Sequence, residues 1–367
     1  MSGVEFFPST FDVVLRILKG AVVAHASDVH LRVGVPPMVR VEGEILPLEH
    51  PPVEEALISG AISTLMAAAG CRRDHGSGLS REFSVDIPDV GRFRAHAYRQ
   101  KGTDALVLRY IPSPIPELAA LRIPPVAKRI ALEDRGLVLV TGATGNGKST
   151  TIAAMLDYMN RKVPKHVVTI EDPVEFVFDD DQCTFSQREV GRDVKDLGDG
   201  LRAAMREDPD VIFVGEIRAP DEFDVALTAA EAGHLIVSTF HSADSSSALM
   251  RMINLYPQDY RDAARQRVAD AVTGIISQRL VPQRGTNQRV LIAEILRPTP
   301  TVQDCIRDPN RFRGIPAALE ASTHEYGTQS FDQQLLAMVR DGLVSIDTAR
   351  AAARSPKDLV RNLKLTR

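Results

Sequence analysis

The residues best suited to chemistry form a glycine-rich stretch near the middle of the chain. Residues 141–151 read Thr-Gly-Ala-Thr-Gly-Asn-Gly-Lys-Ser-Thr-Thr and follow the apolar run 136–140. Gly-x-x-x-x-Gly-Lys-Ser between strand-like and helix-like segments is the P-loop pattern, in which backbone N–H groups face phosphate. Lys148 would neutralise phosphate charge, and the Ser149 hydroxyl can ligate Mg²⁺. We therefore expect ATP and Mg²⁺ at Gly142, Ala143, Thr144, Gly145, Asn146, Gly147, Lys148, Ser149 and Thr150.

Two acidic stretches follow that could turn nucleotide binding into hydrolysis. Hydrolysis needs a carboxylate that supports Mg²⁺ and a group that orients the attacking water. Residues 167–175 place Glu171, Asp172 and Glu175 just past a strand, where ligands of open α/β sheets gather. Residues 208–218 resemble a Walker-B strand, except that Gly215 stands where an aspartate is usual and leaves Glu216 as the acid. Ser149 and Glu216 are thus the expected Mg²⁺ ligands, direct or through water.

A third strand-like stretch, residues 233–244, carries two histidines. His234 precedes the apolar run, and His241 follows the Thr239 end of the same run. His241 is the better placed of the two to sense a γ-phosphate or complete the site. A single histidine is as often structural as functional, so His234 or His241 alone identifies no site. The order and spacing of the P-loop, the two acidic stretches and this histidine stretch are together much more specific.

The elements that must position these residues alternate along the second half of the chain. Short apolar strands at 137–141, 166–170, 211–214 and 235–239 alternate with helical stretches, which is typical of a mostly parallel sheet covered on both faces. Helices are expected again over about 331–363, with breaks near Gly342 and Pro356. The fold class is therefore α/β.

The first part of the chain has a different pattern. Helical periodicity over 10–26 and about 53–69, with strand-like alternation over 28–44, 82–86, 92–98 and 105–111, predicts a small α+β unit. Prolines at 112, 114, 116, 124 and 125 then block regular structure and indicate a linker. We expect an N-terminal domain over 1–111, a linker over 112–125, and an ATPase domain over 126–367.

Composition narrows the class of protein further. The 367 residues are 44% hydrophobic and 25% charged, which is an ordinary composition. The net charge of −4 does not suggest a protein that coats nucleic acid or an anionic membrane. Cys71, Cys183 and Cys305 are too scattered for a zinc site or a disulfide framework, so a reducing cytosol is the expected compartment. No apolar run approaches the ~20 residues of a membrane span.

Taken together, these motifs resemble the secretion ATPase superfamily, which powers type II and type IV secretion and type IV pili. The resemblance is carried by the P-loop, Thr-Ile-Glu-Asp-Pro-Val-Glu at 169–175, and the stretches at 209–218 and 233–242. Residues 27–31, 34–40, 91–97 and 108–112 are similar to that family's PAS-like N-terminal domain. Residues 326–333, Tyr-Gly-Thr-Gln-Ser-Phe-Asp-Gln, resemble the C-terminal signature of its PilT-like, twitching-motility retraction branch.

This resemblance implies a homohexameric ring in which a RecA-like ATPase domain and the PAS-like domain hold ATP between them. It implies that Arg94 and Arg109 reach the nucleotide, with Arg92 and Arg99 as weaker candidates. It further implies that Glu171 is the base for water, that Glu216 supports Mg²⁺ and water, and that His234 and His241 form a histidine box. Sequence leaves open whether the two glutamates exchange roles.

The retraction branch fits the chain better than its relatives do. Pilus-assembly and type II secretion ATPases usually carry an extra N-terminal domain and a four-cysteine zinc insertion, and three scattered cysteines cannot build that insertion. Residues 304–308 keep only part of a segment usual in the retraction branch. The expected partners are the pilus machinery and its inner-membrane platform protein, and the expected location is the cytoplasmic side of the inner membrane, by peripheral association.

Three other interpretations stay open at this point. The chain could be an ATPase for type IV secretion or conjugative DNA transfer. A RecA-like single-stranded DNA helicase needs a basic groove with stacking aromatics, which zero tryptophans and 5% aromatic residues do not favour. A catalytically idle ring that regulates a homologue conflicts with the intact Lys148, Glu171 and Glu216.

Overall fold

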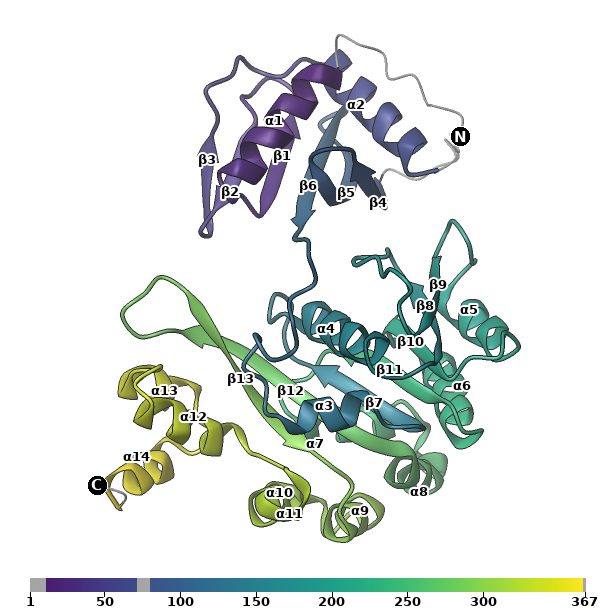
Figure 1. Ribbon diagram of the computed structural model, residues 1–367, viewed down its shortest axis with the longest axis vertical. Helices are drawn as coiled ribbons and strands as arrows, with labels where there is room; N and C mark the ends of the chain where they lie inside the picture. The colour runs from purple at the N-terminus through teal and green to yellow at the C-terminus, as the bar shows by residue number, and fades with distance from the viewer. Residues whose placement is uncertain (1–10, 71–79, 366–367) are drawn as a thin grey trace. The chain divides into compact units, whose positions relative to one another are not determined.

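The computed structural model describes residues 11–70 and 80–365 (Figure 1), so Cys71 and the first ten residues of the expected N-terminal domain lie outside it. The chain divides into two compact units. The N-terminal unit comprises residues 1–114 together with the loop segments 172–177 and 189–193, and the C-terminal unit comprises the remaining residues. Each unit contains one sheet, which confirms a mixed α/β protein with two sheets.

The N-terminal unit is a six-stranded antiparallel sheet with the order β3-β2-β1-β6-β5-β4. Its core joins helix residues such as Leu18 and Leu65 to strand residues such as Phe83, Phe93 and Leu106, all of which are fully buried. The expected alternation is visible on β5, whose buried and less buried residues alternate along most of the strand. Its elements are α1 (Phe11–Val23), β1 (Asp28–Arg32), β2 (Met38–Val41), β3 (Glu44–Pro47), α2 (Glu55–Ala68), β4 (Ser80–Ile87), β5 (Gly91–Gln100) and β6 (Thr103–Ile111).

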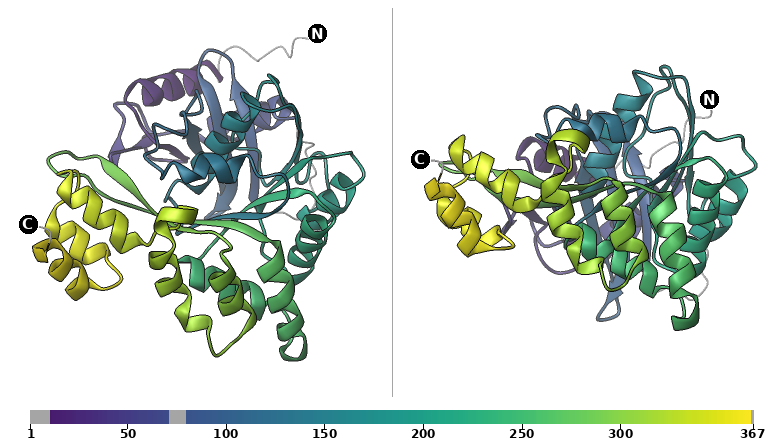
Figure 2. Two further views of the ribbon diagram at one scale, coloured as in Figure 1. Left: turned by 60° about the horizontal axis from the view of Figure 1, so that its bottom comes forward. Right: turned by 90° about the horizontal axis from the view of Figure 1, so that it is seen from below.

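The C-terminal unit contains a seven-stranded sheet with the order β13-β12-β7-β11-β10-β8-β9. The pairs among β12, β7, β11, β10 and β8 are parallel, and β12 with β13 is antiparallel. Strands β7 and β11 are buried along their whole length because helices cover both faces of the sheet (Figures 1 and 2). The strands are β7 (Gly136–Thr141), β8 (His166–Glu171), β9 (Thr184–Glu189), β10 (Val211–Glu216), β11 (Leu235–Phe240), β12 (Val272–Pro282) and β13 (Arg289–Leu296).

The helices of this unit follow the expected alternation, and the last three form a group beside the β12–β13 hairpin (Figure 2). That group has its own small core, in which Phe331, Leu335 and Val344 meet Val281 and Ile292 of the hairpin. The helices are α3 (Val126–Ala131), α4 (Lys148–Asn160), α5 (Leu197–Ala204), α6 (Pro220–Glu231), α7 (Ser245–Asn254), η1 (Gln258–Tyr260), α8 (Arg261–Ala271), α9 (Pro300–Arg307), η2 (Phe312–Gly314), α10 (Ile315–Ala321), α11 (Thr323–Tyr326), α12 (Phe331–Arg340), α13 (Ile346–Ala352) and α14 (Pro356–Leu365). None of the helices in the described ranges is both long and apolar enough to cross a bilayer.

Candidate nucleotide site

The glycine-rich stretch links the end of β7 to the start of α4. Gly147 caps α4 in the left-handed conformation, with φ 80°, so the loop turns directly into the helix. Gly142 has φ 150°, and a Cβ atom there would lie 2.5 Å from the carbonyl oxygen of Gln278. The Lys148 ammonium donates to the carbonyl oxygens of Gly142 (3.0 Å) and Ala143 (3.3 Å) and is 9% exposed. The loop therefore curls around the lysine that would meet a phosphate.

Strand β12 braces this loop from the neighbouring position in the sheet. The Gln278 side chain donates from Nε2 to the Asn146 carbonyl (2.6 Å), and Asn146 donates from Nδ2 to the Gln278 carbonyl (3.3 Å). The Thr141 hydroxyl donates to Ser277 Oγ (2.9 Å). Sequence reasoning missed Ser277 and Gln278, because they match no motif and lie more than 130 residues from the loop they hold.

Glu216 lies at the end of β10, immediately after a bulge. The pairing of β10 with β11 slips between Val214 and Glu216, so Gly215 is the extra residue. The hydroxyl of Thr239 donates to the Gly215 carbonyl (2.6 Å) and fixes the bulge. A bulge of this kind changes the direction of the side chain that follows it, which here is Glu216.

The carboxylate of Glu216 contacts Arg218 and His241. Arg218 donates to it at 2.8 Å, and His241 Nε2 lies 3.4 Å from its other oxygen. Burial by itself raises the pKa of Glu216, but Arg218, His241 and Lys148 outweigh burial and hold that pKa below 4.5. Glu216 is therefore ionised at neutral pH, and the structure brings it together with His241 beside the charge of Lys148.

Glu171 ends strand β8, which is parallel to β10 and adjacent to it. Its side chain is 6% exposed and accepts a hydrogen bond from the Thr169 hydroxyl (2.7 Å). Gln187 of β9 lies at 3.5 Å from the same oxygen. Both glutamates thus stand at the carboxyl edge of the parallel strands, which is also the edge from which the P-loop leaves β7.

His234 is not brought to this group of residues. It precedes β11, whereas His241 follows it, and a six-residue strand separates two such positions by about 20 Å. The Nδ1 atom of His234 lies 2.9 Å from the Pro209 carbonyl oxygen, at the amino-terminal edge of the sheet. Its place in the structure is therefore a contact between the start of β11 and the loop before β10.

Arg94 and Arg109 belong to the N-terminal unit, where they face each other on β5 and β6. Arg94 donates to Glu82 (2.6 Å) and to Glu175 (3.1 Å), the latter carried by the loop segment that packs in this unit. Burial opposes the charge of Arg94, but its bonds to Glu82 and Glu175 prevail and raise its pKa. Arg109 donates to the buried Asp28 (2.9 Å) and keeps 62% of its side chain exposed. The structure thus places both predicted arginines on one face of one sheet.

The donor groups at the sheet edge fit a magnesium-bound nucleotide. The Ser149 hydroxyl lies in the first turn of α4, and Glu216 is ionised, so the pair offers the hard oxygen ligands that Mg²⁺ prefers. The buried hydroxyl of Thr151, two residues after Ser149, has no hydrogen-bond partner among the described residues. Taken with the curled loop and Lys148, these groups form a polar cradle of the kind that binds phosphate.

The fold and this cradle define a P-loop nucleotide-binding protein of the α/β class. The family model described as "Type II/IV secretion system protein" matches residues 104–330. The chain is 39% identical to the type IV pilus retraction ATPase PilT of Pseudomonas aeruginosa, over 91% of this chain and 96% of that protein. It is 36% identical to a twitching motility protein of Neisseria gonorrhoeae, over 88% of this chain and 86% of that protein.

A solved structure agrees with these sequence matches. The crystal structure of the pilus retraction motor PilT with bound ADP superposes with a TM-score of 0.86 and 38% identity, over 95% of this chain and 99% of that one. The chain therefore belongs to the Type II/IV secretion system protein family, as one of its PilT-like ATPases. The resemblance seen in the sequence motifs is confirmed.

Proposed function

We propose that this protein is an ATP-hydrolysing motor that powers the retraction of type IV pili and, through it, twitching motility. One observation carries the proposal. The ionised Glu216 stands beside His241 at the sheet edge where the P-loop and Lys148 lie. An ionised carboxylate next to a phosphate cradle supports hydrolysis rather than binding alone. Relatives named for pilus retraction and twitching motility support the retraction task.

In this proposal the two glutamates divide the chemistry of hydrolysis. Glu171 accepts the proton of the attacking water, and Glu216 orients that water. Ser149 and Glu216 would hold Mg²⁺, directly or through water, and the ion would neutralise charge on the phosphates. Lys148 exchanges the loop carbonyl oxygens that it now contacts for phosphate oxygens. His241, whose Nε2 lies 3.4 Å from a carboxylate oxygen of Glu216, donates a hydrogen bond to the γ-phosphate. His234 keeps the structural contact described above.

Force generation is assigned to the N-terminal unit. We infer that it is a PAS-like domain, that the C-terminal unit is RecA-like, and that six copies form a ring. Arg94 and Arg109 then close on the nucleotide and stabilise charge that develops during phosphate transfer. Their shared face on β5 and β6 supports a joint action. Arg109 is the more available of the two, because most of its side chain is exposed.

The proposal also assigns a place and partners. The ring works on the cytoplasmic side of the inner membrane, bound peripherally to the pilus machinery through its platform protein. The net charge of −4 gives no reason to expect a nucleic-acid substrate.

A deletion strain tests the retraction task. We expect abundant surface pili and lost twitching, restored by the wild-type gene and not by a gene carrying Lys148→Ala. A strain that becomes bald would instead indicate a pilus-assembly motor. Normal pili and twitching with lost DNA transfer or effector secretion would indicate the secretion alternative. Stimulation of ATP hydrolysis by single-stranded DNA, titrated at fixed salt concentration, would support the helicase alternative.

A further inference from the structure

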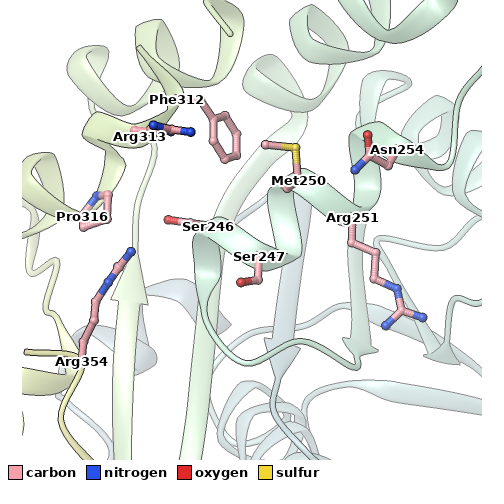
Figure 3. A pocket seen from close by; sticks show the side chains of 9 residues that line it. All are labelled: Ser246, Ser247, Met250, Arg251, Asn254, Phe312, Arg313, Pro316 and Arg354. Atoms are coloured by element: carbon pink, nitrogen blue, oxygen red, sulfur yellow. The ribbon is translucent and has the colours of Figure 1, made fainter. Parts of the chain in front are cut away.

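A pocket outside the nucleotide site opens between α7, the segment η2–α10 and the link between α13 and α14 (Figure 3). Its volume is about 650 Å³, which is within the range of known ligand sites. All of its lining residues belong to the C-terminal unit. They are Ser246, Ser247, Met250, Arg251, Asn254, Phe312, Arg313, Pro316 and Arg354.

The pocket is positively charged. Three of its nine described lining residues are arginines and none is acidic. Arg251 is engaged, since it donates to the His241 carbonyl oxygen (2.6 Å). The guanidinium groups of Arg313 and Arg354 have no ion pair or hydrogen bond within the described ranges, and Figure 3 shows them on the same side of the pocket as Ser246 and Pro316. Arg354 also lies close enough to the buried Glu294 to interact with its carboxylate electrostatically, but neither guanidinium is held by a contact ion pair in the described ranges. Two such cations beside one cavity attract an anionic ligand.

The same pocket also offers an apolar surface. Met250 is 36% exposed and lies across the cavity from Pro316. Phe312 is held in place, because the Arg265 guanidinium lies over its ring at 5.6 Å from the centroid. Phe312 itself is only 6% exposed, so Met250 and Pro316 supply the open apolar surface, and the flexible thioether of Met250 can accept apolar side chains of differing shape.

We propose that this pocket docks an acidic segment of a partner protein, which inserts an apolar side chain between Met250 and Pro316 and pairs its carboxylates with Arg313 and Arg354. Arginine, methionine and aromatic residues are the types enriched in protein interfaces. A site for a small phosphate ligand would hold the anion with fixed, largely enclosed donors. Here Arg313 and Arg354 are exposed, which suits a peptide that supplies several carboxylates.

Helix α7 connects this pocket to the nucleotide site. Arg251 holds the carbonyl of His241, whose ring faces Glu216. At the start of the helix, the Ser245 N–H donates to the buried Glu294 (2.8 Å), and Ser245 Oγ lies 3.1 Å from Ser277 Oγ. Ser277 in turn accepts from Thr141, the residue before the P-loop. A partner seated on α7 therefore contacts the element that holds both His241 and the start of the loop.

Peptide binding to the assembled protein tests the proposal. The probe is a fluorescein-labelled peptide, Glu-Glu-Phe-Leu-Glu-Glu, measured by fluorescence anisotropy against the same peptide with alanines in place of Phe-Leu. We expect the apolar peptide to bind more tightly than the alanine peptide. The double variant Arg313→Gln, Arg354→Gln should bind it at least about tenfold more weakly, with its basal ATP hydrolysis unchanged. The matched control is Arg284→Gln, Arg289→Gln, which removes two exposed arginines from the β12–β13 hairpin and should bind normally.

Three results would overturn the proposal. The first is an absence of binding to the wild-type protein. The second is an equal loss of binding in both double variants, which would mean attraction to net charge alone. The third is displacement of the peptide by inorganic phosphate at concentrations that leave ionic strength matched, which would identify a small-anion site instead.

Discussion

Replacing Glu216 by glutamine separates its role in catalysis from its role in stability. The variant keeps the shape of the side chain and loses the charge that faces Arg218, His241 and Lys148. If Glu216 orients the attacking water, turnover should fall by about 10²–10⁴-fold, or roughly 3–5 kcal/mol in the barrier. The lost ion pair with Arg218 is worth little for folding, at most about 1 kcal/mol, because Arg218 is 67% exposed. ATP binding should change by no more than a few fold.

The assay is single-turnover ATP hydrolysis with a parallel measurement of nucleotide affinity and of urea unfolding. Arg218→Gln is the matched control, since it breaks the same ion pair and keeps the carboxylate. Turnover of that control should stay within about tenfold of the wild-type value. Near-normal turnover in Glu216→Gln would refute the assignment, and so would an equal loss in both variants, which would point to the ion pair rather than to the carboxylate.

Three further changes test other parts of the site. Burial raises the pKa of Glu294 above 4.5, so the group favours folding most below pH 4.5 and that contribution is lost as the pH rises through the raised pKa. Glu294→Gln, which keeps an acceptor for the Ser245 N–H, should therefore gain stability relative to the wild type in urea unfolding as the pH rises above 4.5, and a difference that does not change with pH would contradict this. Gly142→Ala should weaken ATP binding by about 1–3 kcal/mol in a titration, because its Cβ would meet the Gln278 carbonyl, and unchanged affinity would show that the loop yields freely. Arg109→Ala should lower the rate of ATP hydrolysis more than it lowers nucleotide affinity when both are measured on the same preparation, and the reverse pattern would make Arg109 a binding residue.

Local patterns in the sequence were sufficient for much of this architecture. The P-loop, the strands that end at Glu171 and Glu216, and the helices after residue 331 each leave a signal within about twenty residues, through periodicity, glycine spacing or a breaker such as Pro356. The class of the fold follows from the alternation of strand and helix, and it is confirmed by the two sheets. The motif order was enough to indicate the family.

Contacts between distant segments could not be read in the same way. The loop 172–177 follows β8 directly, yet Glu175 pairs with Arg94 and the Val174 carbonyl accepts from Ser84 in the N-terminal unit. Gln278 holds Asn146 across 132 positions. No period or spacing encodes such pairs, because each depends on which strands the fold makes adjacent.

The bulge at Gly215 shows how both kinds of information meet at one residue. From sequence, glycine in the usual aspartate position is a departure from the Walker-B pattern. In the structure it is the extra residue that shifts Glu216 by one place along β10, and the Thr239 hydroxyl fixes it from β11. Successive residues of a regular strand point to opposite faces of the sheet. A shift of one residue therefore turns the side chain of Glu216 to the opposite face from the one it would have in a regular strand. Gly215 lacks the carboxylate expected at its position, but the bulge that it forms brings the carboxylate of Glu216 to His241.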